Sequence, residues 1–247
     1  MKPNLLTVIT LLTAFTLPAL SQAQTAQAPP KLYTGSIGAG LALTGGNTDT
    51  TNFNLTGELV RDPKKRNVLK LNGLYLRADA DNETVSDRLM LALRDDYALS
   101  KKNFLYGAFS YLRDPFKEIS YLMNPQGGIG RKIIATDQVA FSLSGGGGVV
   151  WEMNPGFDVA TSGTLNAGES FSYKFSDRAA LSQVIAALWK TSDFNDAFYH
   201  FGIALTASIT SKAALKVEFL DDFKNVTPSP AIKKNDTAFI TSFLYKF

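Results

Sequence analysis

The sequence predicts an all-β protein, a transmembrane antiparallel up-and-down β-barrel of about 12 strands. Three observations predict this fold class: a leader-like N-terminus, polar and apolar residues that alternate along most of the chain, and an aromatic last strand. Every second side chain of a strand points the same way, so one face of that strand carries Phe239, Thr241, Phe243, Tyr245 and Phe247. A closing strand that faces lipid explains this aromatic face.

Residues 1–23 have the layout of a secretory signal peptide. Lys2 precedes an apolar stretch at 5–17, and Ser21-Gln22-Ala23 places small residues at both recognition positions. We expect cleavage after Ala23, with Ala28 as a second acceptable site. The apolar run is too short to span a bilayer core. The predicted organisation is therefore a signal peptide (1–23), a short N-terminal segment (24–31) and an outer-membrane β-barrel (32–247).

Composition excludes several classes of protein. Loss of Lys2 with the signal lowers the formal charge from +3 to +2, which argues against nucleic acid as a partner. The chain has no Cys, so disulfides, thiolate zinc sites, thiol nucleophiles and a lipoprotein anchor are excluded. Outside the signal no apolar segment is long enough for a membrane helix. The 17 Phe, 9 Tyr and 19 Gly residues are typical of a β-rich chain.

The first four strands follow clear alternation. Residues 32–43 alternate Tyr33, Ile37 and Leu41 with small or polar residues, and a turn follows at 44–49. Residues 53–59 alternate apolar residues with Asn, Thr and Glu58, as a strand between lipid and a polar lumen should. A strand at 69–75 follows a charged turn at 61–66. The next strand, at 89–99, follows an acidic loop at 79–86.

The next four strands include two irregular positions. They are expected at 105–111, 121–134 and 139–151, with the last of the four ending at residue 175. Pro125 lies inside the second of these, where it lacks the N–H that a sheet ladder needs. Glu169 falls on the same face as Phe171 and Tyr173, which indicates a bulge or a shifted register.

Strands at 181–189, 199–209, 215–219 and 239–247 complete the count at an even number, as an antiparallel barrel requires. Short turns alternate with longer loops along the chain. The aromatic residues form two girdles. The outer girdle has Phe53, Tyr75, Tyr111, Trp151, Trp189, Tyr199, Phe201 and Phe239, and the inner has Tyr33, Tyr97, Tyr173, Phe175, Tyr245 and Phe247. Alternation alone would also suit a soluble lipocalin-like or sandwich protein, but signal, girdles and terminal Phe favour a membrane barrel.

Three short blocks carry a family resemblance: LTGGNTDT at 43–50, RDDYAL at 94–99 with FLY at 104–106, and GGIG at 127–130. They resemble motifs of a Gram-negative family labelled salt-induced outer-membrane protein, a domain of unknown function, over residues 33–247. The resemblance implies location in the cell outer membrane and brings no activity or catalytic residues. Phe243, Tyr245 and Phe247 also resemble the signature that the barrel-assembly machinery recognises.

Potential sites for chemistry are few. His200 is the only histidine and could serve as a general base, but no nucleophile motif accompanies it. The glycines at 145–148 lack the lysine of a phosphate cradle and suit a bent strand better. The acids at 79–87 could hold Ca²⁺ but lack the calcium-loop glycine. We expect a protein that is not an enzyme and that has no cofactor and no metal.

Charged residues on the inward faces leave three functions open. The candidate lumen-lining residues are Glu58, Arg88, Arg94, Asp96, His200, Lys216 and Glu218. We expect Arg88 and Arg94 to face Glu58 or Glu218. Such charges could line a narrow pore for small solutes or ions, or pair and close the lumen of a structural or envelope-stress barrel. A lipid-modifying enzyme is the third possibility.

The expected partners follow from a location in the outer membrane. They are outer-membrane lipid and lipopolysaccharide, with the barrel-assembly machinery during biogenesis, and we expect a monomer. Lys224, Lys233 and Lys234 could meet lipopolysaccharide phosphates as point charges.

Overall fold

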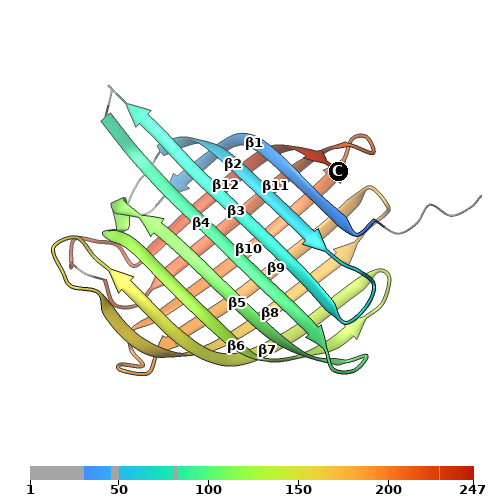
Figure 1. Cartoon of the computed structure of the whole chain (residues 1–247). Coiled ribbons are helices and arrows are strands. Elements are labelled where there is room, and N and C mark those ends of the chain that lie inside the picture. Colours follow the sequence, from blue (N-terminus) through green and yellow to red (C-terminus); the bar gives the residue numbers. More distant parts are fainter. Residues whose placement is uncertain (1–30, 46–49, 81–82, 228) are drawn as a thin grey trace, which may run out of the picture. The chain divides into compact units, whose positions relative to one another are not determined.

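The computed structural model describes residues 31–45, 50–80, 83–227 and 229–247, which form one closed antiparallel β-barrel (Figure 1). Each strand pairs with its neighbours in sequence, and β1 pairs with β12 to close the barrel. The predicted all-β fold class and the count of twelve strands are confirmed. The strands are β1 (Tyr33–Gly45), β2 (Thr50–Arg61), β3 (Asn67–Ala80), β4 (Glu83–Ala98), β5 (Asn103–Asp114), β6 (Ile119–Ala135), β7 (Val139–Met153), β8 (Ala160–Lys174), β9 (Ala179–Lys190), β10 (Ala197–Ser208), β11 (Ala213–Lys224) and β12 (Asn235–Lys246).

Some sequence predictions fall on residues that the structure does not describe. The expected signal peptide at 1–23, residues 24–30 of the following segment, and residues 46–49 of the first family block lie outside the described ranges. None of the helical residues described is part of a helix long and apolar enough to cross a membrane.

The two ends of the barrel differ in their connections. One end, which we call the turn end, carries the turns at 62–66, 99–102, 136–138, 175–178 and 209–212. The opposite end, which we call the loop end, carries the longer connections at 154–159, 191–196 and 225–234, and the 3₁₀ helix η1 (Pro115–Lys117). This alternation of short and long connections agrees with the sequence prediction.

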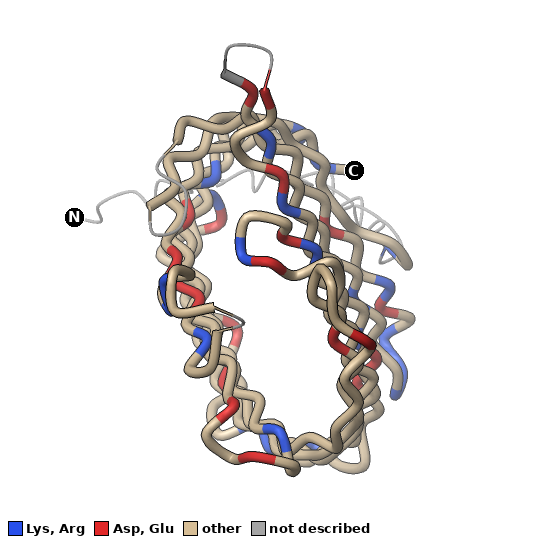
Figure 2. The backbone as a smooth tube through the Cα atoms, turned by 90° about the vertical axis from the view of Figure 1, so that its left-hand side faces the viewer, with Lys and Arg blue, Asp and Glu red and all other residues tan. Residues whose placement is uncertain are grey.

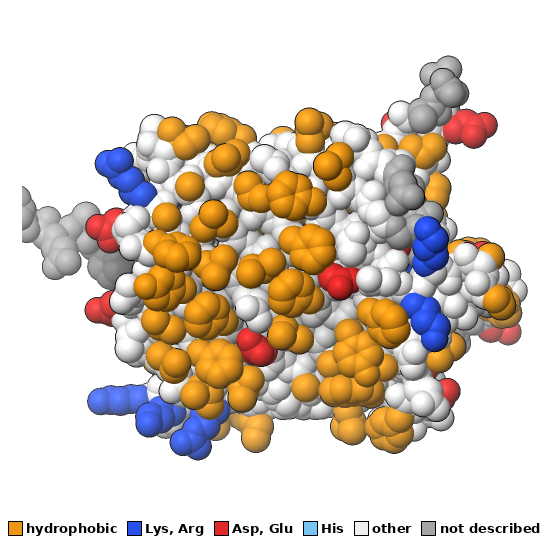
Figure 3. Space-filling model, turned by 180° about the vertical axis from the view of Figure 1, so that it is seen from behind, with side chains coloured by type: hydrophobic (Ala, Val, Ile, Leu, Met, Phe, Trp, Pro, Cys, Tyr) orange, Lys and Arg blue, Asp and Glu red, His pale blue; other side chains and the backbone are white. Residues whose placement is uncertain are grey.

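The outward face of the barrel is apolar. Large side chains such as Ile37, Leu41 and Ile129 are 60%, 62% and 65% exposed. Figure 3 shows such side chains as a broad band between the two ends, interrupted by a few acidic residues. Water would make an exposed apolar surface of this size unstable, whereas lipid would stabilise it.

Aromatic side chains lie at both edges of this band. Near the loop end, the indole N–H of Trp189 donates to the Tyr199 hydroxyl at 3.0 Å. Near the turn end, Tyr173 and Phe175 meet edge to face with ring centroids 4.9 Å apart. These pairs lie where the two girdles were predicted, at the levels suited to lipid headgroups.

Strand β6 continues through Pro125, and a neighbouring side chain compensates for the missing N–H. Pro125 pairs with Phe109 of β5, while the ladder to β7 is interrupted between Met123 and Gln126. There the Nδ2 of Asn124 donates to the Val149 carbonyl at 2.9 Å. The Val149 carbonyl therefore keeps a donor although proline supplies none.

The predicted irregularity at Glu169 is wrong. Strand β8 keeps an uninterrupted register with β7 and β9, and Glu169 stays on the outward face opposite Leu143 and Ile185. The Gln183 amide donates to the carboxylate of Glu169 at 3.2 Å, so a polar pair replaces the expected bulge. Register shifts occur instead in β3, β5 and β6.

The glycines of β6 and β7 allow a strongly concave bend, as the sequence predicted. A Cβ added to inward-facing Gly128, Gly146 or Gly148 would lie 2.2 Å from a carbonyl oxygen of the paired strand. Outward-facing Gly107 has open space instead. Only glycine fits the concave side of such a bend. Figure 2 looks into the barrel from the loop end and shows an oval wall with charged residues on both long sides.

Candidate functional site

The lumen is the candidate site, because charged side chains converge inside it at the loop end. Asp222 of β11 is 1% exposed and forms an ion pair with Arg88 of β4. These two strands are separated by β12, β1, β2 and β3, so the pair crosses the interior. The Nδ1 of His200 lies 2.6 Å from the other Asp222 oxygen, and the Nε of Arg88 lies 3.8 Å from Asp114.

A loop side chain joins this group. Lys117 of η1 is 2% exposed, and its Nζ lies 2.9 Å from the Asp236 carboxylate and 3.5 Å from the Asp222 carbonyl oxygen. The connection between β5 and β6 therefore folds over the interior and is tied to β11 and β12.

A second group lies beside the first. Glu152 of β7 is 2% exposed and contacts both Lys224 of β11 and Lys190 of β9, the latter at 2.7 Å. Lys190 also contacts Asp196 at 2.6 Å. We call both groups together the loop-end network, which consists of Arg88, Asp114, Lys117, Glu152, Lys190, Asp196, His200, Asp222, Lys224 and Asp236.

Apolar side chains fill space next to the loop-end network. One buried cluster joins Leu76 of β3 to Leu220 of β11, together with Ala42, Ala238 and Ile240. Another combines Leu112, Ile119, Leu122 and Val150, and Phe198 of β10 packs against it. Strands from opposite walls therefore touch at the loop end through apolar contacts as well as ion pairs.

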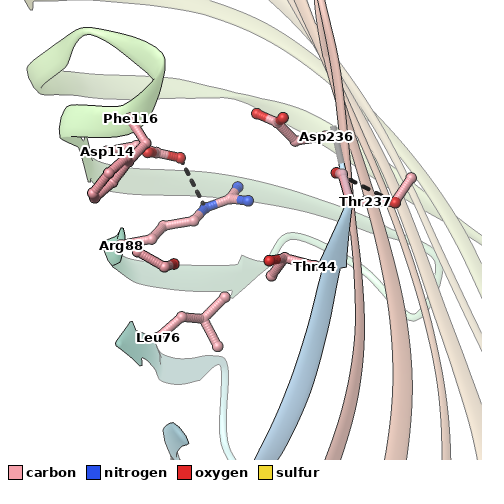
Figure 4. A pocket seen from close by; sticks show the side chains of 9 residues that line it. Thr44, Leu76, Arg88, Asp114, Phe116, Asp236 and Thr237 are labelled. Carbon is pink, nitrogen blue, oxygen red and sulfur yellow. Dashed lines mark hydrogen bonds and ion pairs between the residues drawn. The ribbon is translucent and has the colours of Figure 1, made fainter. Parts of the chain in front are cut away.

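One cavity within the loop-end network is small. Its volume is about 30 Å³, and it is lined by Arg88, Asp114, Phe116, Asp236 and their neighbours. Figure 4 shows Arg88 reaching from β4 toward Asp114, with Asp236 and Thr237 across the cavity. Such a space holds one or two water molecules and no organic solute. Ion pairs and apolar contacts between opposite walls therefore cross the lumen at its loop end.

The turn-end half of the lumen is different, because inward-facing side chains there remain exposed. Asn72, Ala92, Ser170 and Ser182 occupy inward positions by their strand register and are all exposed. A side chain inside a closed barrel is accessible only if the barrel holds space for water beside it. This half therefore contains an open vestibule.

Charged residues also line this vestibule. Lys70 and Arg94 both contact Asp96, at 3.1 and 2.8 Å, and Lys216 contacts Glu218 at 2.9 Å. The Arg94 guanidinium carbon lies 4.1 Å from the ring centroid of Tyr106, a cation–π contact that holds the side chain near the wall. We define the turn-end vestibule by its inward charged residues, Glu58, Lys70, Arg94, Asp96, Lys132, Lys174, Lys216, Glu218 and Lys246.

The seven candidate lumen residues divide between the two regions. Arg88 and His200 belong to the loop-end network, and the other five, Glu58, Arg94, Asp96, Lys216 and Glu218, lie in the turn-end vestibule. The expected ion pairs of Arg88 and Arg94 with Glu58 or Glu218 are wrong. Arg88 contacts Asp222 and Asp114, and Arg94 contacts Asp96 two residues along its own strand.

Several residues of the loop-end network were missed. Asp222 and Lys224 continue the inward alternation of Lys216 and Glu218, so their direction was readable from the sequence. Lys117 lies in a 3₁₀ helix between strands, so the alternation of residues along the strands could not predict its inward position. Lys224 was expected to meet lipopolysaccharide, but it is 3% exposed and bound to Glu152 inside the barrel.

The structure gives no support to the two other sites considered in the sequence, His200 as a general base and the acids at 79–87 as a Ca²⁺ site. His200 is held by Asp222, and no hydroxyl of a described residue is hydrogen-bonded to its ring. Among the acids considered for Ca²⁺, Asp79 pairs with Arg77 and Asp87 pairs with Arg113. No cluster of three or more potential metal ligands occurs in the described ranges.

A family model described as a protein of unknown function, DUF481, matches residues 37–247. The chain belongs to the DUF481 family. That description includes no response to salt, so the salt-induced label remains a prediction. A search of curated proteins found no sequence similar to this chain.

Solved structures with the same architecture include porins. The NanC porin aligns with a TM-score of 0.57 at 8% identity, over 87% of this DUF481 chain and 100% of the porin. An outer-membrane channel from Pseudomonas putida F1 aligns with a TM-score of 0.49 at 14% identity, over 87% and 95% of the two chains. The KdgM porin gives 0.48 at 12% identity, over 86% and 99%. At these identities the NanC likeness shows the fold alone.

Proposed function

We propose that this protein is a narrow pore of the outer membrane for small solutes or ions, closed at its outer mouth in the state described here. The exposed inward residues of the turn-end half, Ala92 and Ser182 among them, are the observation that carries the proposal. A barrel built only for structure has no need of water-filled space along half of its interior. Porins conduct through such polar, hydrated interiors.

The orientation proposed follows the usual rule for these barrels. Short turns face the periplasm and longer loops face the cell exterior. The turn end is then periplasmic and the loop-end network closes the outer mouth. Opening requires Lys117 and Arg88 to leave Asp236 and Asp222, with which they pair across the interior.

A structural barrel with a permanently closed lumen is the second candidate. The buried pair of Arg88 with Asp222 and the buried pair of Lys224 with Glu152 favour it, because both tie opposite walls together. Breaking such buried pairs costs about 3–5 kcal/mol each. A barrel that never opens would keep both pairs at all times.

Conductance of the refolded protein in a planar bilayer separates the two candidates. We expect discrete current steps from the wild type, and more frequent or longer openings when Asp222→Ala removes the common partner of Arg88 and His200. A wild type and an Asp222→Ala variant that both insert and both remain silent would support the structural barrel.

Location and assembly are proposed on the same grounds. The apolar belt and the expected signal peptide support recovery with outer membranes, in contact with lipid and lipopolysaccharide, as a monomer. Recovery of the mature chain as a soluble periplasmic protein would contradict this location.

Phe247 provides the test of assembly. Its backbone N–H and carbonyl both bond to Gly35, so it joins the last residue of the chain to β1. We expect Phe247→Asp to lower the yield of folded barrel in cells through the assembly machinery. Leu99→Asp, an exposed turn-end position outside the last strand, is the matched control. Equal yields for both variants would argue against recognition of the terminal strand.

A further inference from the structure

We infer that the turn-end vestibule binds small anions, so that the pore favours anionic solutes. The inference rests on the proposed pore and names the class of its solute. It starts from the charge on the inward wall. In the described residues the vestibule has six cations, Lys70, Arg94, Lys132, Lys174, Lys216 and Lys246, against three acids, Glu58, Asp96 and Glu218.

The loop-end network has no such excess. Its described members are four cations, Arg88, Lys117, Lys190 and Lys224, and five acids, Asp114, Glu152, Asp196, Asp222 and Asp236, beside His200. The positive charge of the lumen is therefore concentrated at the turn end, where the wall is open to water.

Some vestibule cations form no direct ion pair, although the Asp62 carboxylate attracts Lys132 from a greater distance. Lys132 and Lys174 point inward near the rim, are exposed, and form no ion pair with any residue that the structure describes. Lys246 donates to the Ser208 hydroxyl at 2.7 Å. An ammonium group that contacts no carboxylate directly remains available to bind a mobile anion.

A pocket at the turn-end rim is lined by three lysines. This pocket of about 560 Å³ lies between β1, β12 and the turn after β10, and Lys31, Lys212 and Lys246 line it. Its other lining residues are Thr34, Ser211 and the outward-facing Gly35, Tyr245 and Phe247, so the pocket lies at the rim, partly outside the lumen, and no Asp or Glu side chain lines it. Three lysines around one pocket suit carboxylate or phosphate groups, which accept hydrogen bonds from several ammonium groups.

Position strengthens the attraction. Clefts lined by one sign of charge with low-dielectric walls concentrate counter-ions by about tenfold or more. Screening at physiological salt acts over about 8 Å, comparable to the separations inside a narrow lumen. The vestibule cations therefore act together on an ion that enters from the periplasmic side.

The first measurement is the reversal potential of the refolded full-length mature protein in a tenfold KCl gradient. We expect chloride to be preferred over potassium by at least about threefold, a low estimate for such a cleft. Lys132→Gln with Lys174→Gln should move the ratio toward unity. Lys65→Gln with Lys101→Gln makes the same charge change at exposed turn positions and should leave most of the preference.

A second measurement, of thermal stability, does not depend on whether the pore conducts. Inorganic tripolyphosphate at constant ionic strength should raise the midpoint of heat unfolding of the wild type by at least about 2 °C. The Lys65→Gln, Lys101→Gln control should show the same rise, and the Lys132→Gln, Lys174→Gln variant should lose most of it.

The outcomes separate the two proposals. A cation-selective or unselective wild type, or an equal tripolyphosphate effect in both double variants, overturns the anion vestibule while the pore stands. Silent bilayers with a stabilisation that depends on Lys132 and Lys174 overturn the pore and support the vestibule.

Discussion

The loop end and the turn end of the lumen use the same kinds of side chain for opposite purposes. At the loop end, Arg88, Asp222 and Glu152 are almost fully buried and paired across the interior. At the turn end, Lys216 pairs with Glu218 along its own strand and leaves the space between the walls open. Charges paired between opposite walls bridge the lumen, whereas charges paired along one strand do not.

This difference has an energetic consequence. A buried pair loses its hydration, so removal of one partner leaves an uncompensated charge in a confined site. A pair that keeps part of its hydration loses little when one partner is removed. The two ends should therefore respond very differently to single substitutions.

The largest effect is expected at Asp222. Asp222→Ala should lower the free energy of unfolding by about 3–5 kcal/mol, because Arg88 and His200 lose their common partner. Glu218→Ala, which removes the partner of Lys216 in the vestibule, should cost at most about 1 kcal/mol. Denaturant unfolding of the refolded barrels measures both. Similar losses at the two positions would remove the distinction between the two ends.

The next largest loss of stability is expected at Asn124, in the part of β6 nearer the loop end. Asn124→Ala should cost about 0.5–1.5 kcal/mol, because it leaves the Val149 carbonyl without the donor that replaces Pro125. Pro125→Ala in the same variant restores a backbone N–H and should recover part of the loss. Unfolding in denaturant gives both values, and no recovery would mean that Asn124 acts through packing instead.

A smaller effect on stability, with a clear effect on conduction, is expected at Arg94. Arg94→Glu reverses a vestibule charge beside Asp96 and should shift the reversal potential toward cations. Glu58→Gln should shift it the opposite way. Both shifts should shrink in 1 M salt, where screening acts within about 3 Å. Unchanged selectivity in both variants would place these residues outside the conduction path.

The smallest effect belongs to the turns. A hydrogen bond from Lys64 holds the pKa of Asp62 below its usual value, against a smaller opposing effect of burial. A lowered pKa in the folded state adds stability above the usual pKa, and that stability disappears as pH falls. Asp62→Asn should cost less than about 1 kcal/mol at pH 7, and the cost should disappear at a pH low enough to protonate Asp62 in the folded protein. A cost that persists at low pH would point to a cause other than charge.

Much of the barrel was predictable from local alternation. Period-two patterns located all twelve strands and the inward direction of Glu58, Arg94 and Lys216, because side-chain direction in a strand depends only on parity. Partners across the lumen were not predictable. The contact of Arg88 with Asp222 depends on how the closed sheet brings β4 and β11 together, which no local pattern contains.

Two other features needed the structure for related reasons. The side-chain amide of Asn124 replaces the N–H that Pro125 lacks. Sequence rules count only backbone N–H groups, so they treat proline as an interruption of the strand and cannot predict this replacement. Glu169 stays on the outward face beside Gln183, because a neighbouring amide makes a carboxylate tolerable there without a register shift.

Labelling of single thiols tests the central claim most directly, since the chain has no cysteine of its own. Ala92→Cys and Ala238→Cys both place a thiol on the inward face, the first in the exposed turn-end half and the second at the loop end, where Ala238 is 1% exposed. A hydrophilic maleimide added to the folded barrel should label Ala92→Cys rapidly and Ala238→Cys only after unfolding. Equal labelling of the two thiols would contradict a lumen that is open at the turn end and closed at the loop end.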